Sequence, residues 1–384
     1  MKFFVFNLMP YRDLDPSYRG PAWVDVPNKL YEPEKGHVYY NEYIDQLVEA
    51  ESLGFDGVCV NEHHQNAYGN MPSPNLIASI LARQTERIRI AVVGNALPLY
   101  NPPTRVAEEF AMIDVISGGR LIAGMVVGGG PEYYSFGINP TYARELFYEY
   151  HDLIIAAWTK EGPFSFEGKH VRLRKINPWP RPLQRPHPPV WIPGAGSLET
   201  MEFVASKRYS YMGIPYFHID VFRRNFSFFR EACERAGYTP DPEQAGWLVP
   251  IYVGDDDVSA RRESHLWYFV KRLLPGITIV PPGYTSERSW LAIIENAGTF
   301  MESVETWEEI EKGEYAIVGG PETVADKLSR YIRELGVGVL LGLFQLGSMP
   351  HAQAVDNMRR FAEAVLPRLR EEFAGWGGTG PTPI

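Results

Sequence analysis

The most informative segment of this chain is Gly54-Phe55-Asp56-Gly57-Val58-Cys59-Val60-Asn61-Glu62-His63-His64. Residues 55–60 are apolar and rich in β-branched side chains, and Gly54 suits the end of a preceding helix, so the segment predicts a short buried strand. A carboxamide, a carboxylate and two imidazoles follow directly. Polar groups at the C-terminal end of a core strand are typical of the catalytic end of a (β/α)8 barrel. The alternative is that they are surface residues opening a loop.

The rest of the chain repeats this order of strand and helix. The eight expected strands are 3–8, 55–60, 88–93, 120–127, 190–192, 209–212, 247–253 and 337–344. The expected helices are 39–53, 76–85, 103–117, 139–158, one directly after 197, 220–236, 321–335 and 353–373, with a small hairpin at 164–171. A doubly wound sheet also alternates, but eight units in one run favour a closed ring. The predicted fold is α/β, a single (β/α)8 TIM barrel with insertions.

No lasting change of composition marks a domain boundary. Residues 1–373 are therefore expected to form one barrel, with an insertion at about 273–313 where the alternation breaks. The loop at 10–36, rich in Pro, Tyr and Asp, is expected to be a mobile lid. Residues 374–384, rich in Gly, Pro and Thr, are expected to form a disordered tail.

Bulk composition excludes several classes of function. The 384 residues carry a net charge of −10 without a block of like charges, which argues against nucleic acid or an anionic membrane as a partner. Only two cysteines are present, Cys59 and Cys233, so no disulfide framework is expected, and Cys59 reads as a small core residue. Met1 runs directly into the first strand without a signal peptide, and no apolar run reaches 18 residues, so a cytoplasmic location is expected.

Four strand ends carry informative residues together: Glu62-His63-His64, Val93-Gly94-Asn95-Ala96-Leu97-Pro98, Val127-Gly128-Gly129-Gly130 and Gly194-Ala195-Gly196-Ser197. In this combination the chain resembles the bacterial luciferase-like flavin monooxygenases, from about residue 2 to residue 373, with a poor match over 273–313. The most specific pieces are 54–64 and the run from Leu97-Pro98 through Asn101-Pro102 to Ser117-Gly118-Gly119-Arg120.

The resemblance implies a barrel that binds reduced FMN, supplied by a separate NAD(P)H-flavin reductase. The flavin would react with O2 to give a C4a-hydroperoxide that oxygenates a small organic substrate. Such a site must exclude water and manage one proton near neutral pH, which is the natural task of histidine. The resemblance also implies a homodimer.

Three residues are carried over as the catalytic set. His63 matches the family's catalytic histidine and would govern protonation of the oxygen adduct or the substrate; a buried structural histidine is the alternative. His64 matches the second histidine, and because consecutive residues leaving a strand point to opposite sides, both need not face the flavin. Glu62 would orient an imidazole or hold the loop.

The cofactor set comes from the other strand ends. Val93 and Gly94 fall where the family often has a non-prolyl cis peptide under the flavin ring, although an ordinary glycine at a strand end fits equally. Asn95 would lie near the edge of that ring, and Val127 and Gly128 would line the same site.

The phosphate of the cofactor is expected at Gly194, Ala195, Gly196 and Ser197, where a helix begins and backbone N–H groups are free. A plain turn with a serine N-cap is the alternative. Arg144 matches a family arginine close to the phosphate, and a solvated Arg on a helix surface is its alternative.

The chain departs from luciferase itself. It has Val126-Val127 in place of a Cys-Arg pair and Ala195 in place of a glutamate, so light emission is not expected. Aromatic residues in the expected loops suit an apolar or aromatic substrate. They are Trp23, Tyr31, Tyr39, Tyr40, Tyr68, Tyr100, Tyr133, Tyr134 and Phe136.

Three other functions remain as alternatives. A coenzyme F420-dependent oxidoreductase shares the fold but transfers hydride and uses no oxygen. A metal-dependent barrel hydrolase would need three or more converging ligands, and no histidine at another strand end completes such a set, so no metal is expected. The third alternative is a flavin-binding subunit without activity. The sequence does not distinguish hydroxylation, epoxidation and oxygen insertion beside a carbonyl.

Overall fold

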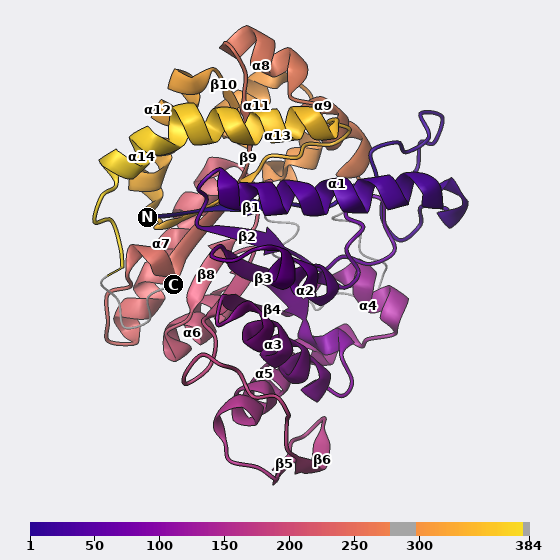
Figure 1. The fold of residues 1–384 in the computed structure, drawn as a ribbon, viewed down its shortest axis with the longest axis vertical. Helices are drawn as coiled ribbons and strands as arrows, with labels where there is room; N and C mark the ends of the chain where they lie inside the picture. Colours follow the sequence, from indigo (N-terminus) through magenta and orange to yellow (C-terminus); the bar gives the residue numbers. More distant parts are fainter. Residues whose placement is uncertain (277–296, 379–384) are drawn as a thin grey trace.

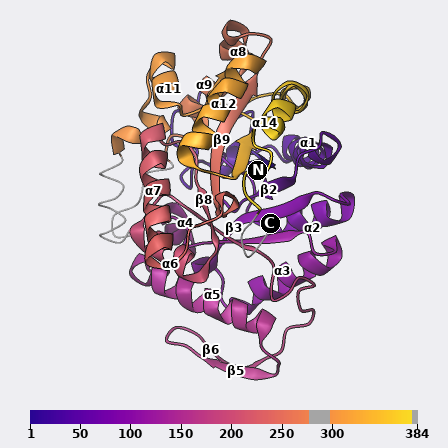
Figure 2. The ribbon, with the colours of Figure 1, turned by 90° about the vertical axis from the view of Figure 1, so that its left-hand side faces the viewer.

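Eight parallel strands close into a ring, and the computed structural model describes residues 1–276 and 297–378 of the chain. Around the ring the strands are β1 (Lys2–Phe6), β2 (Gly57–Val60), β3 (Arg89–Ala96), β4 (Leu121–Val126), β7 (Val190–Gly194), β8 (Ser210–Gly213), β9 (Ala245–Val253) and β11 (Val339–Leu343). β11 pairs back onto β1, with Lys2 opposite Val339, which closes the barrel. The predicted fold class is confirmed, and Figures 1 and 2 show the helices surrounding the strands.

Large apolar side chains fill the inside of the ring. Phe4 of β1 and Trp191 of β7 have ring centroids 5.1 Å apart although their strands are not neighbours, so their contact crosses the barrel interior. Gly57 on β2 makes room for this packing, because a Cβ there would lie 1.9 Å from the Phe4 ring. The barrel is therefore a packed core, and its chemistry is confined to the strand ends.

The helices begin and end at residues with a clear local cause. Pro33, Pro74 and Pro321 occupy first-turn positions, where the missing N–H costs nothing, and Gly118 and Gly336 end helices in the left-handed conformation. The principal helices are α1 (Pro33–Ser52), α2 (Pro74–Gln84), α3 (Thr104–Ser117), α5 (Ala143–Thr159), α6 (Leu198–Lys207), α7 (Ile219–Arg235), α12 (Pro321–Leu335), α13 (His351–Arg360) and α14 (Leu366–Glu372). Shorter helices are α4 (Gly130–Phe136), α8 (Asp257–Glu263), α9 (Leu266–Tyr268) and α11 (Trp307–Gly313).

The predicted bounds of the first helix and the loop before it were wrong. α1 begins at Pro33 rather than Tyr39, because proline is favoured in the first helical turn, so the loop is shorter than 10–36. Tyr11, Leu14 and Trp23 in this loop are buried. The loop pairs with the segment after β2, through Tyr11 N–H to the Ala67 carbonyl.

Other elements were missed or misjudged. α4 was not expected, because the Gly-rich run 128–130 conceals a helix that Pro131 helps to start. The predicted helix 139–158 begins at Ala143 after a 3-10 turn, and the predicted helix 353–373 is interrupted by a π-helical segment at 361–365. β10 (Ile317–Gly319) is an additional strand beside the second half of β9, too short to show a period.

The predicted hairpin is confirmed as β5 (Phe164–Glu167) and β6 (Arg172–Ile176), which stand away from the ring in both views of the ribbon (Figures 1 and 2). In the predicted tail, Trp376 packs on Phe373 and its indole N–H donates to the Val337 carbonyl, so residues up to 378 lie against the barrel. The rest of the tail, 379–384, and residues 277–296 of the predicted insertion lie outside the described residues. Over the part of the chain that the structure describes, no helix is long and apolar enough to cross a membrane.

Candidate active site

Glu62 is the centre of a hydrogen-bond cluster at the C-terminal ends of β2 and β3. Its Oε2 accepts from Asn95 Nδ2 at 3.0 Å, the Ala96 backbone N–H at 3.2 Å and the Tyr100 hydroxyl at 2.8 Å. Its Oε1 lies 2.8 Å from His64 Nε2, and its side chain is only 1% exposed. Burial and then the Glu62 carboxylate raise the pKa of Tyr100, so the phenol keeps its proton and donates. Glu62 therefore ties two strand ends together.

The two neighbouring histidines have different surroundings. His64 is held by Glu62 through Nε2, and its ring meets Phe136 of α4 edge-on at 4.6 Å. His63 instead places Nδ1 3.2 Å from Glu132 Oε1. Each imidazole therefore has its own carboxylate, although both rings contact α4.

Aromatic rings cover His63. Trp23 meets the imidazole edge-on at 5.2 Å, as does Tyr68, and these two rings stack on each other at 4.9 Å. Both are buried. The Tyr68 hydroxyl donates to the hydroxyl of Tyr216, which comes from the segment after β8. The imidazole of His63 is therefore in contact with apolar aromatic surface.

β3 and β4 approach very closely beside this cluster. The Val93–Gly94 peptide is cis, as the resemblance implied, and the register of the two strands shifts at this point. A Cβ on Gly94 would lie 2.7–2.9 Å from the backbone of Gly124 and Met125, so no larger residue fits. Asn95, which follows, is fully buried and its Oδ1 has no partner among the described residues.

Val127 and Gly128 leave the end of β4. The Tyr133 hydroxyl donates to the Val127 carbonyl, and Gly128 has a φ of +95°, which suits glycine. A Cβ at Gly128 would lie 3.2 Å from the Tyr133 ring. This turn leads directly into α4.

Arg144 and Ser197 are brought together, as expected for two groups that share one anion. Arg144, from the first turn of α5, points one guanidinium nitrogen at Ser197 Oγ (3.3 Å) and the other at Thr200 Oγ1 (3.4 Å). Ser197 is the N-cap of α6 and accepts from the Thr200 N–H, so the structure shows the alternative role as a cap. A cation, two hydroxyls and a helix N-terminus gather at this point.

The turn before α6 is pinned by α7. Asn225 Nδ2 donates to the Ala195 carbonyl at 3.0 Å, and Gly194 accepts from the Tyr211 hydroxyl at 2.7 Å. Gly196 has a φ of +101°, and a Cβ there would lie 2.3 Å from the Asn225 amide.

Four residues of this site were not expected to have their present roles: Glu132, Thr200, Asn225 and Tyr100, which donates a hydrogen bond to Glu62. Thr200 had a local signal, since it stands three residues after the N-cap. Glu132 and Asn225 lie on other elements than the groups they hold, and no local pattern points to them.

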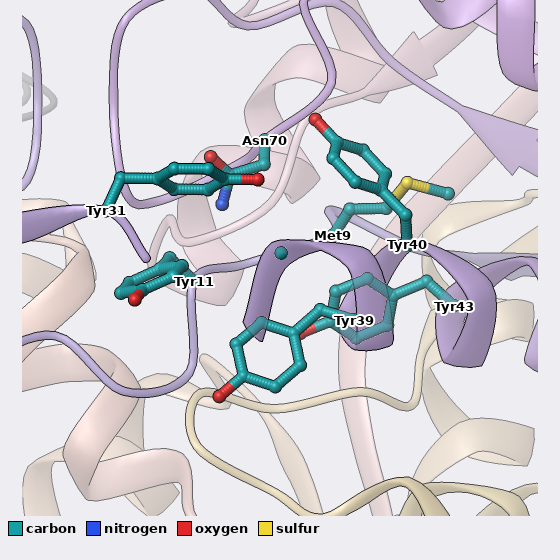
Figure 3. A pocket seen from close by; sticks show the side chains of 8 residues that line it. Met9, Tyr11, Tyr31, Tyr39, Tyr40, Tyr43 and Asn70 are labelled. Carbon is teal, nitrogen blue, oxygen red and sulfur yellow. The ribbon is translucent and has the colours of Figure 1, made fainter. Parts of the chain in front are cut away.

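A pocket lined by tyrosines lies beside this site. Five tyrosines, Met9, Gly36 and Asn70 line it, and they come from the loop after β1, from α1 and from the loop after β2 (Figure 3). The tyrosines are Tyr11, Tyr31, Tyr39, Tyr40 and Tyr43. Burial raises the pKa of Tyr40 to about 12. None of the residues expected in the catalytic or cofactor set lines this pocket.

Both cysteines lie in the interior of the protein. Cys59 and Cys233 are both free and buried, and burial raises the pKa of Cys59. Within residues 1–276 and 297–378, no group of three or more His, Cys, Asp or Glu side chains is arranged to hold a metal ion.

Curated relatives include an uncharacterized protein of Sinorhizobium fredii, y4wF, 37% identical over 163 residues, which are 41% of this chain and 47% of that protein. The chain thus matches about half the length of this relative. The match to 2,5-diketocamphane 1,2-monooxygenase 1 of Pseudomonas putida is 26% identical and covers 83% of this chain and 91% of that protein. The oxygenase component of the flavin-dependent trigonelline monooxygenase of Acinetobacter baylyi is 28% identical over 60% of this chain and 64% of that protein.

Solved structures share the whole architecture. The monooxygenase RslO1 from Streptomyces bottropensis has 25% identity and a TM-score of 0.72 over 96% of this chain and 100% of that one. The oxygenating constituent of 3,6-diketocamphane monooxygenase from Pseudomonas putida, in complex with FMN, has 21% identity and a TM-score of 0.73 over 96% and 98%. The coenzyme F420-dependent tetrahydromethanopterin reductase of Methanopyrus kandleri has 17% identity and a TM-score of 0.65 over 95% and 98%.

The last two likenesses show a common fold, which both flavin and F420 enzymes use. The family assignment comes from the sequence match, which extends over most of the barrel. The model of the luciferase-like monooxygenases matches residues 22–338, and the chain belongs to that family.

Proposed function

We propose that this protein is a flavin-dependent monooxygenase that uses reduced FMN and O2 to oxygenate a small apolar or aromatic organic molecule. The proposal rests on three features that lie at the same end of the barrel. These are His63 among aromatic rings, the cis peptide at Val93–Gly94, and Arg144 facing Ser197. The C-terminal ends of parallel strands meet at one face, so one cofactor can reach all three.

The groups around Arg144 fit the phosphate of FMN. A guanidinium, the hydroxyls of Ser197 and Thr200, and the first N–H groups of α6 are all donors, and the dipole of α6 favours an anion. In this proposal the backbone of the turn formed by Gly194, Ala195 and Gly196 contacts the phosphate.

The groups around Gly94 fit the ring of FMN. Val93, Gly94 and Asn95 form one edge, and Val127 and Gly128 form the next. Gly94 and Gly128 are required by packing within the protein, since a Cβ at 94 would meet the Gly124 backbone and one at 128 the Tyr133 ring, so neither position adds a side chain to this edge. The buried Asn95 Oδ1 has no partner among the described residues, and a donor on a bound ligand would supply one.

Reduced FMN supplies the electrons with which O2 is activated. The chain's own part is to hold and move a proton at His63 Nε2, the ring nitrogen that makes no hydrogen bond among the described residues. Glu62 and His64 keep the ends of β2 and β3 in register. Trp23 and Tyr68 keep water away from the imidazole.

Relatives suggest the class of substrate and the need for a second protein. The diketocamphane enzymes are named for compact ketones, and the trigonelline enzyme is named as an oxygenase component. We therefore propose a separate NAD(P)H-flavin reductase as the source of reduced FMN.

A homodimer is the proposed assembly. Apolar side chains are exposed on α2 and α3, whose helices pack against each other, and such a patch favours burial against a second copy. They are Leu76, Ile80, Met112, Val115 and Ile116. Sedimentation velocity measures the mass of the assembly.

The test is an oxygenation assay in which the protein is supplied with FMN, NADH, a generic flavin reductase and 18O2. A panel of terpenoid ketones and aromatic compounds serves as candidate substrates. Incorporation of 18O into a product supports the proposal. Turnover with reduced F420 and no need for O2 would instead make the protein a hydride-transfer enzyme. His63→Ala should reduce product formation far more than FMN binding, and an equal loss of both would make His63 a structural residue.

A further inference from the structure

We propose that Glu132 is the positioning residue for His63, and that it holds the imidazole in the tautomer protonated at Nδ1. The inference rests on the proposed function, in which Nε2 of His63 handles the proton. It adds a residue from a separate element, α4, to a site otherwise built at the end of β2.

The contact is direct and protected. Nδ1 of His63 lies 3.2 Å from Glu132 Oε1, and the two side chains are 23% and 10% exposed. Glu132 stands in the first turn of α4, a different element from the strand end that carries His63. A carboxylate only accepts hydrogen bonds, so the proton of a neutral His63 must lie on Nδ1.

Within the described part of the chain, Glu132 makes the only hydrogen bond to the His63 ring. Trp23 and Tyr68 touch the imidazole edge-on and offer ring surface. Nε2 has no hydrogen-bond partner among the described residues, so the nitrogen opposite Glu132 is left as an acceptor. A carboxylate that fixes the tautomer in this way also stabilises the imidazolium formed when the base takes a proton.

The neighbouring histidine is bound the opposite way. In His64 it is Nε2 that lies 2.8 Å from a carboxylate, that of Glu62, so its neutral form carries the proton on Nε2. The two adjacent imidazoles therefore have opposite tautomers, so the tautomer of His64 serves as an internal reference for that of His63.

The direct test is 15N NMR of histidine-labelled protein without cofactor, with each signal assigned from His63→Gln and His64→Gln. Wild-type His63 should be protonated at Nδ1 and His64 at Nε2. In Glu132→Ala, His63 should lose its preference while His64 keeps its own. A wild-type His63 protonated at Nε2 would overturn the proposal.

Kinetics provide the second readout. Glu132→Ala should lower kcat about a hundredfold while KM for substrate and Kd for FMN stay within about twofold. Glu132→Gln still accepts from Nδ1–H, so it should retain the tautomer and lose less of kcat, and it serves if Glu132→Ala fails to fold. Glu108→Ala, on the exposed face of α3, is the control. An unchanged tautomer and kcat in Glu132→Ala would refute the role.

The two proposals fail in different ways. If no substrate is oxygenated by the wild type, the proposed function fails, yet the NMR result for Glu132 is still measured. If oxygenation is found and the tautomer is wrong, only the role of Glu132 fails.

Discussion

Replacing Glu62 with Ala should destabilise the barrel more than almost any other single change at the site. The substitution removes both oxygens at once. The Ala96 N–H, the Tyr100 hydroxyl and His64 lose their acceptor, and Asn95 Nδ2 keeps only its contact with the Tyr100 hydroxyl. A buried donor left unpaired costs about 1–3 kcal/mol. Taking the low end for all four, since water can reach some of them after truncation, we expect the free energy of unfolding to fall by about 4 kcal/mol.

Glu62→Gln should be much milder. One amide oxygen can still accept from the three donors at the end of β3, but the amide NH2 then faces His64 Nε2. His64 can accept that hydrogen bond only by moving its proton to Nδ1. The loss is then mainly that of charge, for which we expect about 1–2 kcal/mol.

The measurement is urea unfolding followed by circular dichroism, with the m-value held common to all variants. Glu86→Ala is the control, because that side chain is 85% exposed and its only ion pair with a described residue, Arg87, is at 4.0 Å. We expect it to stay within about 0.5 kcal/mol of the wild type. A Glu62→Ala protein within about 1 kcal/mol of wild type, or a Glu62→Gln protein as unstable as Glu62→Ala, would refute the reasoning.

Three further outcomes are expected. Arg144→Gln should weaken FMN binding about tenfold or more and leave the binding of riboflavin, which has no phosphate, unchanged. The control, Arg174→Gln on the hairpin, should change the affinity for neither ligand. Fluorescence titration measures both affinities. Gly196→Ala should cost about 1–3 kcal/mol more stability than Gly118→Ala, because both have positive φ but only the first meets a side-chain amide at 2.3 Å; equal costs in urea would contradict this. Burial lowers the pKa of His151 from its ordinary 6.5, so the unfolded chain takes up this proton first as the pH falls. The contribution of neutral His151 to the free energy of unfolding is complete above about pH 6.5 and declines below, by at most about 1.4 kcal/mol per pH unit. In His151→Asn the free energy of unfolding, measured between about pH 7.5 and pH 5.5, should decline less steeply.

The barrel and much of the site could be predicted because their signals are local. The strand before Glu62 and the polar run after it lie within one short segment of characteristic composition, whereas a cis peptide at Val93–Gly94 was implied only by the family resemblance. Arg144 and Ser197 were assigned to one phosphate separately, and the structure brings them to 3.3 Å.

The missing parts depend on contacts between distant segments. Glu132 is 69 residues from His63, on a helix that a Gly-rich run conceals, and only the folded barrel brings the two together. Glu62 was expected to orient an imidazole or hold the loop. It contacts His64 and the end of β3, and its hydrogen bond with Tyr100 depends on side-chain conformations that no sequence pattern encodes. β10 has three residues, which is too few to form a periodic signal.

The hairpin of β5 and β6 offers a practical handle on the molecule. It joins the end of α5 to the start of β7, and its turn folds back along α5, where Lys169 and His170 contact Glu145 in the first turn of that helix. Its turn is clamped by the Glu149 carboxylate, which accepts from three successive backbone N–H groups, at 169, 170 and 171. A fluorophore or surface linker attached at the exposed Ser165 or Lys175 would therefore be carried by a hairpin that is fixed to α5, which suits immobilisation of the protein.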